Sequence, residues 1–108
     1  MKKKTLVQLR HIADRIPRQC PCDIAALLYS ICEEWEFAFL NGCLVFMEDG
    51  TPVLVMPLTT IYGTLKAGDT LYILCNNGAL HYFDRMTHQY WVTFLDNTDE
   101  DFFDSMFN

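Results

Sequence analysis

The first third of the chain carries apolar residues at helical spacing in two segments. In the first, these residues recur every three or four positions, which predicts a helix over roughly residues 4 to 16 that Pro17 ends. The second segment repeats the pattern from Ile24 to Trp35. Pro21 suits the first position of that helix, and Asp23 suits the positive end of its dipole. Two N-terminal helices are therefore expected.

Residues 35–40 leave two interpretations open. Their aromatic residues alternate with other side chains, and Asn41-Gly42 follows them, which favours a strand leading into a hairpin. A helix that runs on to Leu40 and is capped by Gly42 fits the same residues. We adopt the strand, which predicts that Phe37 and Phe46 lie opposite one another.

The chain from residue 43 to about residue 95 has the alternation and the turn signals of β-strands. Apolar runs flank Asp49-Gly50 and Asn77-Gly78, and a short loop at 85–87 precedes the last run. We therefore predict an α+β fold in which two N-terminal helices precede a five- or six-stranded antiparallel meander sheet or small barrel, followed by a short acidic C-terminal helix or tail. A length of 108 residues with 51% hydrophobic residues predicts one compact domain over residues 1–108.

Turn lengths predict which strand residues share a face. A two-residue loop at Asn77-Gly78 and a three-residue loop at 85–87 place one apolar set in the core: Leu71, Ile73, Cys75, Leu80, Tyr82, Tyr90 and Val92. The opposite face mixes aromatic with hydrogen-bonding groups, as binding surfaces do. On that face we predict a partner-binding site formed by Tyr72, His81, Phe83 and Trp91. The tail, a second copy of the chain or a foreign partner could cover it.

Charge is distributed unevenly along the chain. Residues 1–18 carry six of the eight basic residues and one acid, for a net +5, whereas residues 19–108 carry −11. The segment 96–108 is acidic and aromatic and has no basic residue. It is either a short helix packed on the sheet or a free peptide for a basic, hydrophobic groove. The partner-binding set therefore also includes Asp99, Glu100, Asp101, Phe103 and Phe107.

The remaining chemistry points away from catalysis. Five cysteines at irregular spacings do not form a secreted disulfide framework or a paired zinc knuckle, so we expect reduced thiols, with Cys32, Cys43 and Cys75 buried, and no metal or cofactor. Cys75, His81 and Asp84 have the residue types of a catalytic triad, but the predicted register separates His81 from the other two. No phosphate loop or nucleophile-elbow motif occurs.

These observations favour a small acidic, non-catalytic protein that binds and inhibits or neutralises a macromolecular partner. Immunity proteins, antitoxins and phage-encoded inhibitors are of this type, and the partner would be a protein with a basic surface. The alternative is a nucleic-acid-binding regulator that uses the basic N-terminal residues Lys2, Lys3, Lys4, Arg10 and Arg15, although base-reading groups are missing. A small enzyme is the third candidate. Without an apolar run of 18 residues, we expect no membrane association and a cytoplasmic location, or the host cytoplasm if the source is viral.

Overall fold

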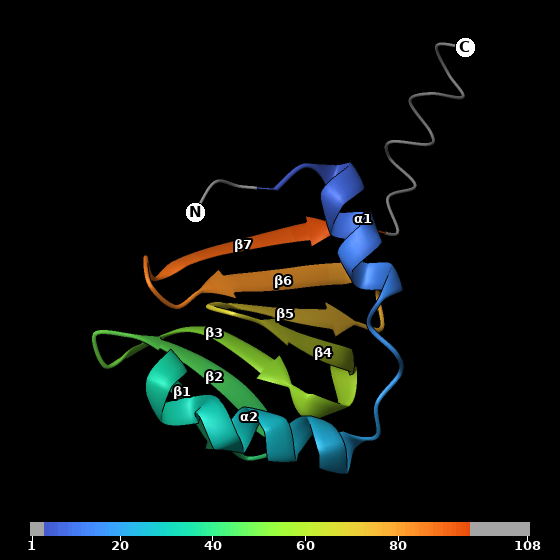
Figure 1. Ribbon diagram of the computed structural model, residues 1–108. Coiled ribbons are helices and arrows are strands. Elements are labelled where there is room, and N and C mark those ends of the chain that lie inside the picture. The colour runs from blue at the N-terminus through green and yellow to red at the C-terminus, as the bar shows by residue number, and fades with distance from the viewer. Residues whose placement is uncertain (1–3, 96–108) are drawn as a thin grey trace.

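A computed structural model describes residues 4–95 and shows an α+β fold of two helices followed by two antiparallel sheets (Figure 1). The elements are α1 (Leu6–Asp14), α2 (Pro21–Trp35), β1 (Phe37–Leu40), β2 (Cys43–Glu48), β3 (Thr51–Pro57), the 3₁₀ turn η1 (Leu58–Thr60), β4 (Ile61–Ala67), β5 (Thr70–Cys75), β6 (Ala79–Asp84) and β7 (Gln89–Phe94). The predicted acidic helix or tail at 96–108 lies outside the described residues.

Both helices begin and end for local reasons. Thr5 and Gln8 form a reciprocal capping box, in which each side chain accepts a hydrogen bond from the other's backbone N–H, so α1 begins at Leu6 rather than at residue 4. The helix α2 begins at Pro21, as predicted. It ends at Trp35 because Glu36 adopts the left-handed conformation, with φ 58° and ψ 43°.

Residues 37–40 are a strand, so the hairpin interpretation is confirmed. Asn41 and Gly42 both have positive φ, 51° and 74°, as a type I′ turn requires. Phe37 lies opposite Phe46, as the hairpin predicts. Strands β1, β2 and β3 form one antiparallel sheet in that order.

The sheet prediction is wrong in number, because the structure has seven strands in two sheets rather than five or six in one. The apolar run after Asp49-Gly50 is divided by η1 into β3 and β4. Pro57 ends β3, and its carbonyl accepts a hydrogen bond of 2.7 Å from the Thr60 hydroxyl within the turn. Strands β4 to β7 then form the second sheet in sequence order.

The predicted register of β6 is also wrong, by one residue at each end. The loop before β6 has three residues, and Gly78 takes the left-handed position at φ 86°, so that Tyr72 lies opposite Tyr82. The loop after β6 has four residues and places Asp84 opposite Gln89. Because side chains alternate along a strand, β6 presents the opposite face to that predicted, while β5 and β7 keep theirs.

The second sheet is therefore buried on both faces. One face contributes residues such as Leu71, Ile73 and Phe83 to a core shared with the first sheet and α2. The other face packs Tyr72, Leu80 and Tyr82 against Leu9 and Ile16 from α1 and its C-terminal flank. Two aromatic-rich cores thus lie on either side of one sheet.

The connection between the helices lies along the edge of β4. The backbone N–H of Gln19 donates to the carbonyl of Tyr62 at 2.9 Å, and its side-chain amide bonds the backbone of Thr64 in both directions. At Gly63 the approach is so close that an added Cβ would lie 2.3 Å from the carbonyl oxygen of Pro17. The connection thereby covers an edge that would otherwise expose unpaired groups.

Candidate functional site

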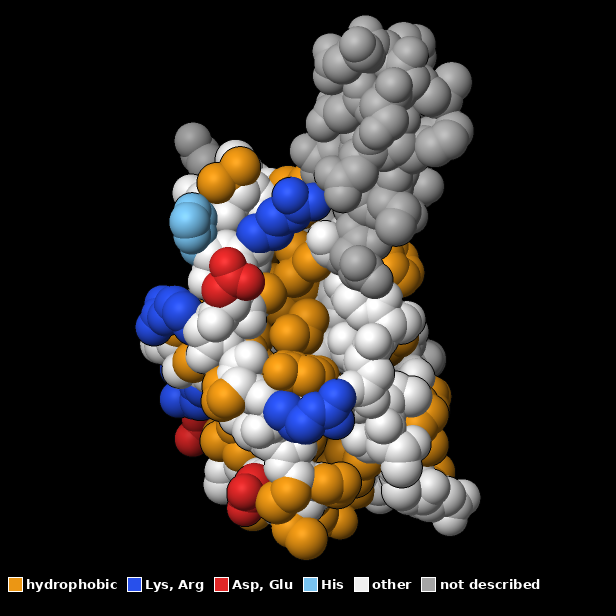
Figure 2. All heavy atoms as spheres, turned by 90° about the vertical axis from the view of Figure 1, so that its right-hand side faces the viewer, with side chains coloured by type: hydrophobic (Ala, Val, Ile, Leu, Met, Phe, Trp, Pro, Cys, Tyr) orange, Lys and Arg blue, Asp and Glu red, His pale blue; other side chains and the backbone are white. Residues whose placement is uncertain are grey.

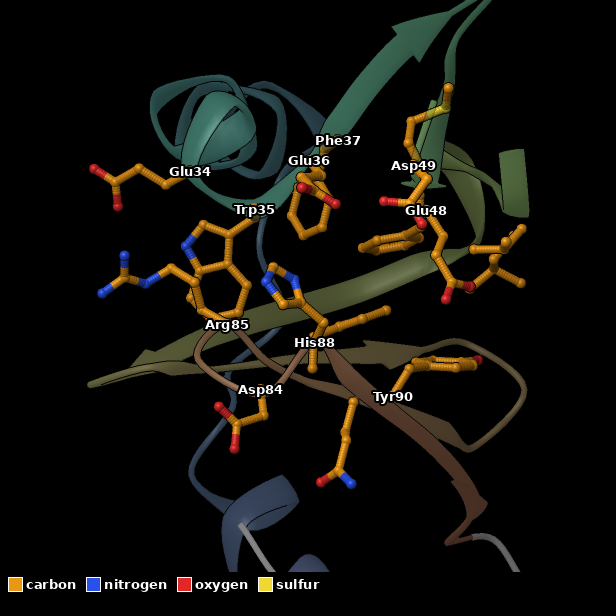
Figure 3. A pocket seen from close by; sticks show the side chains of 16 residues that line it. Glu34, Trp35, Glu36, Phe37, Glu48, Asp49, Asp84, Arg85, His88 and Tyr90 are labelled. Atoms are coloured by element: carbon orange, nitrogen blue, oxygen red, sulfur yellow. The ribbon is translucent and has the colours of Figure 1, made fainter. Parts of the chain in front are cut away.

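A pocket of about 410 Å³ opens between the two sheets, where the end of α2, the β2–β3 turn and the β6–β7 loop meet (Figure 3). Its apolar wall is formed largely by aromatic rings. Phe83 stacks on Phe46 with ring centroids 3.9 Å apart, and Phe37 meets Phe46 edge-on at 4.3 Å. These three rings are at least nine-tenths buried, so they form a rigid base rather than an exposed patch.

Exposed carboxylates surround this aromatic base. Glu34 and Glu36 come from the end of α2, Glu48 is the last residue of β2, and Asp49 begins the turn after it. Within residues 4–95, the carboxylates of Glu36, Glu48 and Asp49 form no ion pair with a basic side chain. The rim is therefore strongly negative above an apolar wall.

Arg85, a basic residue in the lining, offsets this charge only in part. The guanidinium of Arg85 pairs with Asp69, which lies outside the lining, at 2.6 Å. This hydrogen bond, together with the charge of Asp69, raises the pKa of Arg85. Arg85 is thus paired with a carboxylate outside the lining, although the charge of Glu34 on the rim also contributes to raising its pKa.

Tyr90 is the exposed member of the stacked rings at the pocket, and its position is fixed from two sides. Phe83 stacks on it at 4.7 Å between centroids, and its hydroxyl lies 2.6 Å from Nδ1 of His81. Burial, with a smaller contribution from Cys75, raises the pKa of Tyr90 to about 12, and burial lowers the pKa of His81. Both groups are therefore neutral at pH 7, and the ring is held with 39% of its surface exposed.

Three rim residues have a backbone conformation that glycine adopts more easily. Glu36 has φ 58° where helices commonly end in glycine, Asp49 has φ 51° in the β2–β3 turn, and His88 has φ 55° in the β6–β7 loop. In the view of Figure 3, the His88 ring lies between the indole of Trp35 and the ring of Tyr90. Strained residues cluster at functional sites, and here three of them line one pocket.

Trp35 adds an unsatisfied donor to the same wall. Its side chain is 7% exposed, and its indole N–H has no acceptor among the described residues. A buried donor without a partner is costly, so each instance requires an explanation. The nitrogen has almost no exposed surface, so a ligand in the pocket does not reach it unless the wall moves.

The structure does not bring the sequence-predicted aromatic site together. Tyr72 and Trp91 lie on the face that α1 covers, where both are near the ring of Tyr82. His81 and Phe83 lie on the opposite face, and they reach the pocket directly or through Tyr90. The prediction that these four residues share one face is wrong, because the register of β6 differs by one residue and its side chains point to the opposite faces. Whether these residues bind a partner stays a prediction, and Asp99, Glu100, Asp101, Phe103 and Phe107 lie outside the described residues.

The basic residues of the nucleic-acid alternative are spread around α1. Arg10 lines a second, shallow hollow with Asp14 and Leu95, and Arg15 is exposed at the helix end. Figure 2 shows the basic side chains of this face separated by an apolar strip. Lys4 is half-buried, while Lys2 and Lys3 lie outside the described residues. Among described residues, this arrangement does not form the continuous basic groove that a phosphate backbone requires.

The cysteine predictions hold only in part. All five cysteines are free, and Cys75 is buried as predicted, but Cys32 and Cys43 are only half-buried. Burial raises the pKa of the Cys75 thiol, whose sulfur lies 3.8 Å from that of Met56. This thiol is therefore protonated at pH 7 and is a poor nucleophile. The corrected register places Cys75 on the face of His81, with Asp84 on the other face. Among residues 4–95, no three potential metal ligands converge.

Sequence reasoning missed the pocket, since its parts come from three distant segments. The local signals were visible: acids follow one another around Trp35, and Asp49-Gly50 places two acids at a turn. The contact between these segments and Tyr90 depends on how the two sheets pack, which a single sequence does not reveal.

The fold and the pocket define an α+β protein of two helices and two meander sheets with an acid-rimmed aromatic pocket. Models of known protein families do not match the chain, and neither do curated proteins or solved structures. Neither helix in the described part of the chain is long and apolar enough to span a bilayer.

Proposed function

We propose that this protein is a small acidic, non-catalytic binder that inhibits or neutralises a macromolecular partner, in the manner of an immunity protein, an antitoxin or a phage-encoded inhibitor. The partner presents a basic protein surface, and the pocket between the sheets receives it. The observation that carries the proposal is the pocket itself, in which exposed acids surround a rigid aromatic wall.

The charge pattern supports a basic partner. Of the acids on the rim, Glu36, Glu48 and Asp49 pair with no described basic side chain, and the chain has a net charge of −6. Such a surface attracts a basic partner over a distance and repels nucleic acid. Association should therefore be fast at low salt and should slow as salt is added.

The aromatic wall supports the interpretation that the binding partner is a protein rather than a small ion. Binding energy in protein interfaces is concentrated in buried aromatic and charged anchors surrounded by a polar rim. The pocket has this arrangement, with Tyr90 partly exposed and carboxylates on the rim.

The proposal is tested by capture of partners from the native host with the full chain, in parallel for two variants. Glu48→Lys with Asp49→Lys reverses the charge of the rim, whereas Asp23→Lys with Glu33→Lys reverses two exposed acids of α2 outside the pocket. We expect one basic protein to be recovered by the wild type and by the α2 variant, and lost by the rim variant. The purified protein should inhibit the activity of the purified partner, and the affinity between the two should fall as salt is raised.

Equal recovery by both variants would show that the pocket is not the binding surface. Recovery of nucleic acid, lost when Arg10 and Arg15 are neutralised, would replace the proposal with the regulator alternative. A partner that is bound through the pocket but keeps its activity would remove the inhibitory part of the function.

A further inference from the structure

The open ring of Tyr90 has a defined environment that a ligand must match. Phe46, Phe83 and Tyr90 form a run of near-parallel rings, with interplanar angles of 15° and 23° between neighbours. The first two are buried and the third is 39% exposed, and the ring of His81 lies nearly parallel to it with centroids 5.9 Å apart, so a part of the Tyr90 ring is left for a flat group. The His81 contact holds this ring in place before any ligand arrives.

Carboxylates line the same pocket as this ring. Glu48 and Asp49 are both exposed in that lining. Neither acid pairs with a described basic group. The group that extends the rings should therefore be flat, apolar on its faces and positively charged.

Among protein side chains, the guanidinium of arginine has all three properties. It is planar, stacks on aromatic faces and pairs with carboxylates through two parallel N–H donors. A lysine ammonium is a compact, strongly hydrated point charge, so it loses more hydration in a half-enclosed pocket and cannot stack. A neutral apolar side chain would fit the wall but would leave the rim acids unpaired.

We propose that the pocket is an arginine-binding site in which the guanidinium stacks on Tyr90 and pairs with Glu48 and Asp49. This inference rests on the proposed function and deepens it, because it names the side chain by which the basic partner is anchored. The volume of about 410 Å³ lies within the range of side-chain and small-ligand sites and accommodates the arginine together with part of its backbone.

The site can be tested without the partner. N-acetyl-arginine N′-methylamide is titrated into the ¹⁵N-labelled full chain, and amide shifts around Glu48, Asp49 and Tyr90 are followed by NMR. The citrulline compound, which has the same shape without the charge, and the lysine compound are titrated in parallel. We expect saturable shifts at these residues with arginine, about fivefold weaker binding with citrulline, and binding of intermediate strength with lysine.

Matched variants then locate the binding. Tyr90→Leu removes the ring and Glu48→Gln removes one charge, and each should weaken arginine binding by about threefold or more. Tyr29→Leu and Glu33→Gln are controls, since both wild-type residues are exposed on α2 outside the pocket, and they should bind as the wild type does. Tyr90→Phe keeps the ring and should retain binding, which distinguishes loss of stacking from loss of folding.

Citrulline binding equal to arginine binding would overturn the proposal, as would shifts located elsewhere or equal effects of the pocket and control variants. If arginine fails to bind while the rim reversal still abolishes partner capture, the proposed function stands with a different anchor. If arginine binds but the host yields no basic partner, the arginine site stands and the proposed function fails.

Discussion

The hydroxyl of Tyr90 lies 2.6 Å from Nδ1 of His81, and this contact joins the edge strand β7 to β6 through their inward-facing side chains. The two rings are nearly parallel, with an interplanar angle of 12°. A partly exposed tyrosine is thereby held in one orientation by a histidine that burial keeps neutral. The stability of the site therefore depends on the protonation of one imidazole.

Stability should fall when the pH drops below the ordinary histidine range. Burial lowers the pKa of His81 in the folded protein, so the unfolded chain takes up a proton first as the pH falls. The contribution of His81 is fully present above its unfolded pKa of about 6.5 and decreases from there down to the lower folded pKa. Urea unfolding at pH 7.5, 6.5 and 5.5 should show this slope in the wild type and in His11→Gln. His81→Gln should lose that part of the slope, and an unchanged slope in this variant would contradict the assignment.

Replacing Glu36 by glycine should stabilise the protein and weaken partner binding. The left-handed conformation at φ 58° is unfavourable for a residue with a Cβ, so Glu36→Gly should raise the free energy of unfolding by about 1 kcal/mol. The same change removes a rim carboxylate. Urea denaturation and partner titration measure the two effects. Glu36→Ala is the control for the charge alone, because it keeps the strained backbone.

Gly63 should not tolerate a side chain. An added Cβ would lie 2.3 Å from the carbonyl oxygen of Pro17 and 2.8 Å from Cγ2 of Ile16. Gly63→Ala should therefore displace the connection from β4 and cost about 2 kcal/mol or more of stability. Gly42→Ala provides the comparison, because nothing lies within 4 Å and only its positive φ resists the change. A milder effect at Gly63 than at Gly42, measured by thermal unfolding, would show that the contact yields easily.

Trp91→Ala should affect stability and not binding. The indole is half-buried under α1 and stacks on Tyr82 with centroids 5.1 Å apart. Truncation should cost about 2 to 3 kcal/mol of unfolding free energy, below the range for fully buried tryptophans. Arginine and partner titrations at a temperature where the variant is folded should match the wild type. A selective loss of binding would restore the site that the sequence predicted.

Much of the fold could be predicted because local signals agreed with tertiary structure. Pro21 marked the start of α2, and Asn41-Gly42 determined both the first hairpin and the pairing of Phe37 with Phe46. The register of β6 could not be predicted in the same way. Asn77-Gly78 is equally compatible with a two-residue turn and with a three-residue loop whose last residue is left-handed. Four residues in the next loop, with His88 in a conformation unusual for histidine, have no clear sequence signal.

The candidate site was harder to predict than the fold, since a one-residue register difference exchanges the faces of a strand. The error at β6 separated Phe83 from Tyr90, although these two rings stack on one another. The sequence shows that the rim residues are acidic, but it does not show that they lie around one pocket. Whether these acids lie close together depends on how the two sheets pack, and the chain connects the sheets through the short turn η1.

The contact between Gly63 and Pro17 has a consequence for the order in which the molecule is assembled. During synthesis α1 is made before the strands that follow it, yet the connection between the helices cannot be fixed until β4 has emerged. The apolar side of α1 packs on Tyr82 and Trp91, which lie near the end of the described chain and are synthesised later. The helix α1 can therefore pack on the second sheet only after β6 and β7 have been synthesised. Until then the nascent chain exposes both Leu9 and the sheet face that will cover it, the interval in which chaperones protect such surfaces.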